Sequence, residues 1–274
     1  MEALDKKLAI VGLGKLGGLL AESFIAQGLL QPKNIIGTVR HKARADKLDL
    51  EHPFAVHTDN RDAVAEADIV LIAVKPQVID EVCEAIRPVV TQDKVIVSIL
   101  AGVTTRAIER FLSDQVPIVR AMPNTPCAVG CGMTVLCRGK AANDDHVALA
   151  RKLFDTVGRT IEMDEKHMDA VTGLSASGPA FIYVILESLA EAGVKMGLPR
   201  DIATLLAAQT TKGAAEQVLV SGAHPALLKD EVTTPAGCTI DGLLELEEGK
   251  LRVTLIKAVV KAGQRARELY TDPD

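Results

Sequence analysis

The sequence is poor in aromatic residues. Aromatic side chains make up 3% of the 274 residues, tryptophan is absent, and 48% of residues are hydrophobic, so most of the apolar mass is aliphatic. This composition excludes a disordered or fibrous chain and suits parallel strands and closely packed helices. At ~150 residues per domain, the length predicts two domains.

The sequence also lacks an excess of positive charge and a long apolar run. Lys+Arg 31 against Asp+Glu 36 gives a net charge of −5, so attraction to a nucleic-acid backbone has no obvious source. Apolar runs such as 69–74 fall far below the ~20 residues needed to cross a bilayer. The charged start shows no secretory signal pattern. We therefore expect a cytoplasmic protein with neither a nucleic-acid nor a membrane partner.

Cysteine and histidine do not form a recognisable framework. The five cysteines are odd in number and never spaced as CxxC, which indicates buried thiols and neither disulfides nor a zinc ribbon. His52 and His57 lie around a proline with no further ligands nearby. We expect both histidines in a surface loop, and no metal site.

The pattern of the chain changes near residue 164. Before it, β-branched runs alternate with amphipathic stretches, which predicts βαβ units and an α/β, Rossmann-type, doubly wound, mostly parallel sheet. We expect strands at 8–11, 34–39, 69–74, 95–99, 118–121, 133–137 and 160–162. We expect helices at 16–27, 62–67, 78–86, 104–111 and 144–156.

Beyond residue 164 the strand pattern disappears and long helical periods take over. The expected helices are 167–174, 179–196, 200–220, 225–232, 239–248 and 251–270. The predicted domains are therefore 1–164, which is α/β, and 165–274, which is all-α.

A glycine-rich motif, Gly12-Leu13-Gly14-Lys15-Leu16-Gly17, follows the first predicted strand and opens a helix. Its glycines permit a tight turn, close approach to a pyrophosphate and packing of helix on strand, while the helix N-terminus offers N–H groups to the phosphates. A flexible turn is the alternative. The strand and helix around the motif favour dinucleotide binding.

The segment 37–44 favours NADPH over NADH. NAD sites usually place an acid ~20 residues past the last glycine to hold the ribose 2′-hydroxyl. Here that region has no acid and carries Arg40, His41, Lys42 and Arg44, which would attract a 2′-phosphate. The alternative is a solvated basic loop.

Three further segments lie at the ends of predicted strands, at the edge where an open α/β sheet binds ligands. They are 75–76, 100–102 and 122–126. Lys75 is either a general acid or a solvated phosphate neighbour. Asn124 lies between two prolines. Its amide either hydrogen-bonds the nicotinamide carboxamide or belongs to a rigid crossover connection that binds no ligand.

Two segments of the helical region, 171–179 and 232–239, place small hydroxyl residues and a glycine before a helix. Such a helix start can bind an anion, because its first N–H groups lack intrahelical partners. Ordinary N-capping explains one such segment well. The presence of two favours a ligand site.

Together these motifs resemble the pyrroline-5-carboxylate reductases, and the resemblance covers essentially the whole chain. One departure is Ala236, where many members have glycine; it matters if the loop requires a positive φ. The shared segments, in the family's order, are 12–17, 73–76, 101–103, 122–126, 170–179, 193–199, 224–225, 232–239 and 242–243.

The resemblance implies NADPH-dependent reduction of the cyclic imine 1-pyrroline-5-carboxylate to L-proline, the last step of proline biosynthesis, with NADH a possible substitute. It implies that the Thr239 hydroxyl bonds the ring nitrogen and that N–H groups of Gly237, Cys238 and Thr239 hold the carboxylate. Val232, Thr233, Thr234 and Ser177 would line the pocket. The implied cofactor contacts are Gly12, Leu13, Gly14, Lys15, Leu16, Gly17, Val39, Arg40, Asn60, Ala73, Val74, Lys75, Pro76, Ala101, Gly102 and Asn124.

Two rival functions stay open. A β-hydroxyacid dehydrogenase resembles this plan but carries a catalytic lysine four residues past its last glycine, where this chain has Ile182, which cannot transfer a proton. A cofactor-binding sensor without turnover could use the same fold.

The helical stretches 180–190 and 202–208 are apolar on most of their circumference, so they need a partner surface. The family forms dimers through these helices and larger rings of dimers. We therefore expect a homodimer through the C-terminal helices within a higher homo-oligomer such as a decamer. The alternative is a self-contained bundle packed on the first domain.

Overall fold

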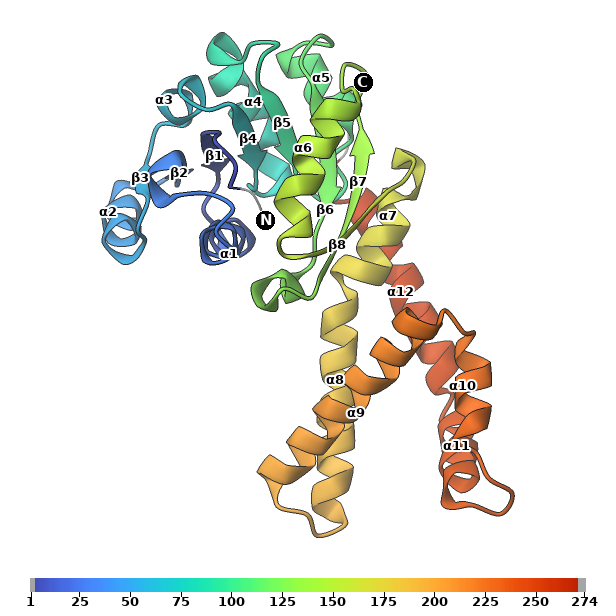
Figure 1. Ribbon diagram of the computed structural model, residues 1–274. Coiled ribbons are helices and arrows are strands. Elements are labelled where there is room, and N and C mark those ends of the chain that lie inside the picture. The colour runs from blue at the N-terminus through green and yellow to red at the C-terminus, as the bar shows by residue number, and fades with distance from the viewer. Residues whose placement is uncertain (1–2, 271–274) are drawn as a thin grey trace. The chain divides into compact units, whose positions relative to one another are not determined.

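The structure is a computed structural model and describes residues 3–270. An eight-stranded sheet in the order β3-β2-β1-β4-β5-β6-β7-β8 organises the first of two compact units, with helices on both faces (Figure 1). Neighbouring strands are parallel except for β6 and β7. The strands are β1 (Leu8–Val11), β2 (Ile35–Thr38), β3 (Ala55–His57), β4 (Ile69–Ile72), β5 (Val95–Ser98), β6 (Ile118–Met122), β7 (Gly132–Arg138) and β8 (Gly158–Glu162).

The alternation of side chains along β1 explains the two cores. Leu8 and Ile10 belong to a cluster with α1, α2 and α6, whereas Ala9 and Val11 belong to one with α3, α4 and α5. Both faces are buried, which accounts for the continuous aliphatic runs. The helices of this unit are α1 (Lys15–Ala26), α2 (Lys42–Glu51), α3 (Asn60–Ala65), α4 (Ile79–Ile86), α5 (Thr105–Leu112), α6 (Asp144–Asp155) and α7 (Met168–Val171).

The doubly wound, mostly parallel sheet is confirmed, but α2 and β3 were missed in the sequence. The expectation of a surface loop is wrong for His57, which ends β3. His52 does lie in the turn between α2 and β3, where its ring stacks on Phe54 with centroids 4.9 Å apart. Each missed element has one buried residue, Ala45 in α2 and Val56 in β3, and therefore shows little apolar periodicity.

The first compact unit extends beyond the sheet domain expected from the sequence. It takes in the chain up to residue 177 and again from residue 261. Hydrogen bonds explain this extent: Thr105 donates to Glu165, and Arg267 Nε donates to Asp169 Oδ2 at 2.9 Å. The boundary between 1–164 and 165–274 stays a prediction about domains.

The second unit, residues 178–260, is all helix. Its buried apolar residues are small: Ala190, Ala203 and Ala207. Larger ones stand in solvent, including Tyr183 at 59% and Leu205 at 64% exposed. One helical unit therefore leaves most of its apolar surface uncovered. Its helices are α8 (Gly178–Lys195), α9 (Arg200–Ser221), α10 (Pro225–Glu231), α11 (Cys238–Glu248) and α12 (Leu251–Arg267), the last of which ends in the first unit.

One stretch of the described chain, 165–195, is long and apolar enough to cross a membrane by length and composition, and 11% of its apolar window is buried. It is interrupted by a π-helical segment, η6 (Thr172–Ala176), between α7 and α8. Its first residues, Glu165 and Asp169, form ion pairs with Arg120 and Arg267. Length and composition alone are therefore weak support for a membrane span.

Candidate functional site

The glycine-rich turn between β1 and α1 leaves an open cradle. Gly12 has a φ of 96°, and a Cβ there would lie 2.7 Å from Val74 Cγ1. A Cβ on Gly17 would lie 2.7 Å from the Gly12 carbonyl oxygen, so this glycine permits the packing of helix on strand. A Cβ on Gly14 would meet nothing within 4 Å. The second glycine therefore faces free space, as close approach of a pyrophosphate requires.

The start of α1 faces this cradle without a side-chain cap. Gly14 is the N-cap residue and offers no side chain to the first N–H groups. Uncapped N–H groups and the helix dipole together favour an anion. Lys15 is exposed, whereas Leu13 is 3% exposed and its backbone N–H donates to the Thr38 carbonyl at 2.7 Å. The buried Leu13 thus holds the glycine-rich turn against the end of β2.

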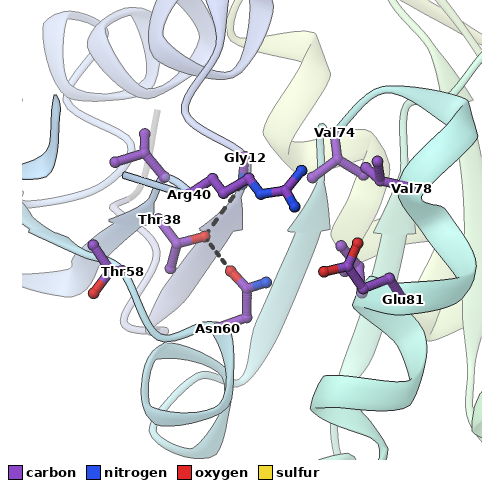
Figure 2. A pocket seen from close by; sticks show the side chains of 10 residues that line it. Gly12, Thr38, Arg40, Thr58, Asn60, Val74, Val78 and Glu81 are labelled. Atoms are coloured by element: carbon purple, nitrogen blue, oxygen red, sulfur yellow. Dashed lines mark hydrogen bonds between the residues drawn. The ribbon is translucent and has the colours of Figure 1, made fainter. Parts of the chain in front are cut away.

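A cavity of about 220 Å³ opens beside the cradle, at the carboxyl ends of β1, β2 and β4. Val74, Val78 and Val82 form an apolar wall, and Arg40 extends from the β2 side toward Val74 (Figure 2). This is the switch point of the sheet, where β1 lies between β2 and β4. Open α/β sheets bind their ligands at such a point.

The polar side of this cavity fits a phosphate. β2 ends in Thr38, followed by Val39 and Arg40, so no carboxylate stands where an NAD site would place one. Arg40 is exposed and supplies the positive charge, while Asn60, at the start of α3, supplies an amide. Sequence reasoning missed five lining residues, because no motif marks them and only the fold brings them to the cavity: Thr38, Thr58, Val78, Glu81 and Val82.

Two other predicted segments lie at the same edge of the sheet. Ala73 to Pro76 follow β4, and Ala101 and Gly102 follow β5. Gly102 has a φ of 80°, and a Cβ there would come within 2.4 Å of the Ala266 carbonyl oxygen, at the end of α12. Lys75 is exposed. The end of α12 therefore packs against the segment that follows β5.

Asn124 is engaged within the protein. Its Oδ1 accepts from the Met133 N–H at 2.9 Å, and its Nδ2 donates to the Ser175 carbonyl at 3.2 Å. One N–H of the amide is left for a ligand. The hydrogen bonds support the reading of Asn124 as part of a stiff crossover, which the sequence left open.

The predicted substrate segment, 232–239, belongs to the second unit. Thr233 Oγ1 donates to the Lys229 carbonyl at 2.8 Å, which uses its only proton. A Cβ on Gly237 would lie 2.4 Å from Thr234 Oγ1, so only glycine fits there. Ala236 has a φ of 57°, the left-handed region that favours glycine. The loop does require a positive φ where this chain has alanine.

Helix α11 begins directly after this turn. Gly237 is its N-cap residue and makes no side-chain cap, so the N–H groups at Cys238 and Thr239 start an uncapped helix. Thr239 is half-buried and Val232 is exposed. Ser177 belongs to the first unit, where its N–H donates to the Thr172 carbonyl at 3.0 Å. The anion site expected at this helix start has the right local geometry.

Comparisons with known proteins agree with this arrangement. Residues 165–269 match the family model of pyrroline-5-carboxylate reductase dimerisation, and residues 7–102 match that of coenzyme F420-dependent NADP oxidoreductases. A structure of Plasmodium falciparum pyrroline carboxylate reductase with NADP bound has a TM-score of 0.90 and 31% identity, covering 98% of this chain and 100% of that one.

Curated relatives match over nearly their full length. Pyrroline-5-carboxylate reductase from Arabidopsis thaliana is 41% identical over 96% of this chain and 95% of its own. That from Synechocystis is 42% identical over 96% of this chain and 98% of its own. By full-length similarity and by fold, the chain belongs to the pyrroline-5-carboxylate reductase family.

Proposed function

We propose that the protein reduces 1-pyrroline-5-carboxylate to L-proline with NADPH, as the last step of proline biosynthesis. The single observation that carries the proposal is the open glycine cradle with Arg40 at the end of β2, in a chain that belongs to this family. NADPH, when bound, supplies the hydride that the imine carbon accepts. The ring nitrogen ends protonated.

The cofactor is held by residues of the first unit. The N–H groups at the start of α1 and the free space at Gly14 receive the pyrophosphate. Arg40 pairs with the 2′-phosphate, and the valine wall of the neighbouring cavity packs against the adenine. The segments at Ala73–Pro76 and Ala101–Gly102 shape the floor toward the nicotinamide.

The substrate carboxylate is held at the start of α11. N–H groups of Gly237, Cys238 and Thr239 offer hydrogen bonds and the positive end of the helix dipole. Thr233, Thr234 and Val232, in the segment before this helix, line the pocket, and Ser177 is a further substrate contact that the family resemblance implies. Because the Thr233 hydroxyl proton is used by the Lys229 carbonyl, Thr233 acts there as an acceptor.

Thr239 orients the ring nitrogen. A threonine hydroxyl has a pKa far from neutral and is a poor proton donor by itself. The imine therefore binds already protonated, and the hydroxyl holds the ring so that its carbon faces the hydride. Thr239→Val nearly keeps the volume and removes the hydroxyl, so we expect kcat/KM for the imine to fall.

A second copy of the chain covers the apolar helix faces of 178–260, forming a homodimer and a higher assembly such as a decamer. Residues 165–269 match a dimerisation model, and exposed Tyr183 and Leu205 need a partner surface. The same partner, rather than a membrane, accounts for the apolar stretch 165–195. We place the enzyme in the cytoplasm. Light scattering is expected to report an oligomer, and a monomer would contradict this assembly.

Functionally, 1–164 is the cofactor domain and 165–274 the oligomerisation and substrate domain. Ile182, 42% exposed on α8, stands where a β-hydroxyacid dehydrogenase has its lysine and cannot transfer a proton.

The test of the proposed function is NADPH and NADH oxidation with five-membered and six-membered cyclic imino acids. We expect oxidation that depends on the imine and is faster with NADPH. A flat absorbance trace would favour a sensor instead.

A further inference from the structure

Thr38 links the glycine cradle to the polar side of the cavity. It ends β2 and is 1% exposed. Its Oγ1 accepts from the Gly12 N–H at 3.3 Å and donates to Asn60 Oδ1 at 2.7 Å. Figure 2 shows the two bonds meeting at this one hydroxyl. A neutral side chain buried at a strand end therefore joins the turn after β1 to the first residue of α3.

The polarity of this link follows from its chemistry. An amide oxygen only accepts hydrogen bonds, so the single hydroxyl proton of Thr38 points to Asn60 Oδ1. The Gly12 N–H fills a lone pair of the same hydroxyl. The amide of Asn60 is thereby fixed with Oδ1 toward Thr38 and with Nδ2 directed away from Thr38 (Figure 2).

The fixed amide directs hydrogen-bond donors at the cavity. Asn60 offers N–H groups, and Arg40, which lines the same cavity and extends toward Val74, offers a guanidinium. The acidic lining residue, Glu81, comes from α4 on the opposite side (Figure 2). Donors and a cation together suit a phosphate monoester, whereas a bare ribose hydroxyl would need an acceptor there.

We propose that Thr38 is a specificity-determining positioning residue, which selects NADPH by holding the Asn60 amide with its N–H groups toward the 2′-phosphate. This inference rests on the proposed NADPH-dependent function. The Thr38 side chain is 1% exposed and its hydroxyl proton is bonded to Asn60 Oδ1, so it acts through Asn60. An amide free to turn would present its oxygen to the phosphate in part of the molecules and lose that hydrogen bond.

The test compares NADPH and NADH binding by isothermal calorimetry in the full-length protein, without imine. Thr38→Val keeps the shape and removes the hydroxyl. We expect NADPH affinity to fall about tenfold, as for a hydrogen bond to a charged group, and NADH affinity to change less than about twofold. Thr38→Ser, which keeps the hydroxyl, should restore the wild-type ratio. Equal losses for both cofactors, or no loss for NADPH, would overturn the proposal.

Asn60→Asp is a second variant for the case in which Thr38→Val does not fold. Its carboxylate still accepts from Thr38 but places negative charge beside the phosphate. We expect NADPH affinity to fall by at least about tenfold while NADH binding is kept. Unchanged NADPH affinity, or parallel loss of both cofactors, would overturn the role of the amide. The binding assay needs no turnover. A negative result in it would overturn the role proposed for Thr38 and Asn60, and the proposed imine reduction would still be tested separately by the oxidation assay.

Discussion

The hydroxyl of Tyr270 donates a hydrogen bond to Oδ1 of Asp80 at 2.9 Å, which joins the chain beyond α12 to helix α4. Gln77 Nε2 donates to the Leu269 carbonyl at 3.2 Å in the same region. Gly102 packs on the Ala266 carbonyl. The residues at the end of α12 therefore brace both segments that we propose to hold the nicotinamide half of the cofactor.

Tyr270→Phe tests this brace. Loss of the hydrogen bond to Asp80 is expected to weaken NADPH binding about threefold to tenfold and to leave the KM of the imine unchanged. Tyr183→Phe is the matched control, because Tyr183 lies on α8, in the other unit. Calorimetric titration with NADPH measures both variants. Equal NADPH affinity in Tyr270→Phe and wild type would show that the bond does not support the cofactor segments.

Glu165 compensates a buried arginine. Arg120 is 2% exposed, its Nη1 donates to Glu165 Oε1 at 3.1 Å, and its Nε and Nη2 have no partner in the described chain. Glu165→Gln would leave that charge uncompensated, so we expect a loss of about 3–5 kcal/mol in the free energy of unfolding. Urea unfolding at one protein concentration measures it.

The control for Glu165 is an exposed ion pair. Glu191 and Arg200, at 2.6 Å, have 57% and 63% of their side chains exposed. Glu191→Gln should leave the free energy of unfolding nearly unchanged, because an exposed ion pair contributes little to stability. If both glutamine variants lost the same free energy of unfolding, the burial of Arg120 would not explain the loss in Glu165→Gln.

The left-handed backbone of Ala236 predicts that glycine is the better residue there. An L-residue at φ 57° costs about 1–2 kcal/mol, partly offset by the greater freedom that glycine has when unfolded. We expect Ala236→Gly to stabilise the protein by about 0.5–1 kcal/mol in thermal unfolding. Ala223→Gly is the control, since its φ is not positive and it should destabilise. A loss of stability in Ala236→Gly would contradict the strain.

Sequence reasoning reached the sheet, the glycine cradle and the helical region because apolar periodicity and glycine spacing are local signals. It missed α2 and β3, which bury one residue each, and it missed Thr38 as the partner of Asn60. A hydrogen bond between residues 22 positions apart has no local signature. The hydrogen bond from Tyr270 to Asp80 likewise has no signal in the sequence, because it depends on how distant segments pack.

Cysteine reactivity gives a pH-dependent test of the core. Burial raises the pKa of the Cys83 thiol to about 12. Burial is also the largest cause of the raised pKa of the Cys137 thiol, which is about 12 as well. The thiolate is the reactive form, so both stay protonated and inert up to about pH 10. Cys127 is also buried, whereas Cys131 and Cys238 are exposed.

At pH 8 we expect a disulfide reagent to modify Cys131 and Cys238 rapidly, and the three buried thiols only after unfolding. Mass spectrometry of the modified peptides identifies the sites. Rapid labelling of Cys83 in the folded protein would contradict the buried core on that face of the sheet.

The most direct test of the central claim follows the hydride itself. NADPH carrying deuterium at both C4 positions is incubated with 1-pyrroline-5-carboxylate and the purified protein, and the proline is analysed by mass spectrometry. We expect proline that carries one deuterium on the former imine carbon, in an amount equal to the NADPH consumed. NADPH that stays unoxidised, or proline that forms without deuterium, would contradict it.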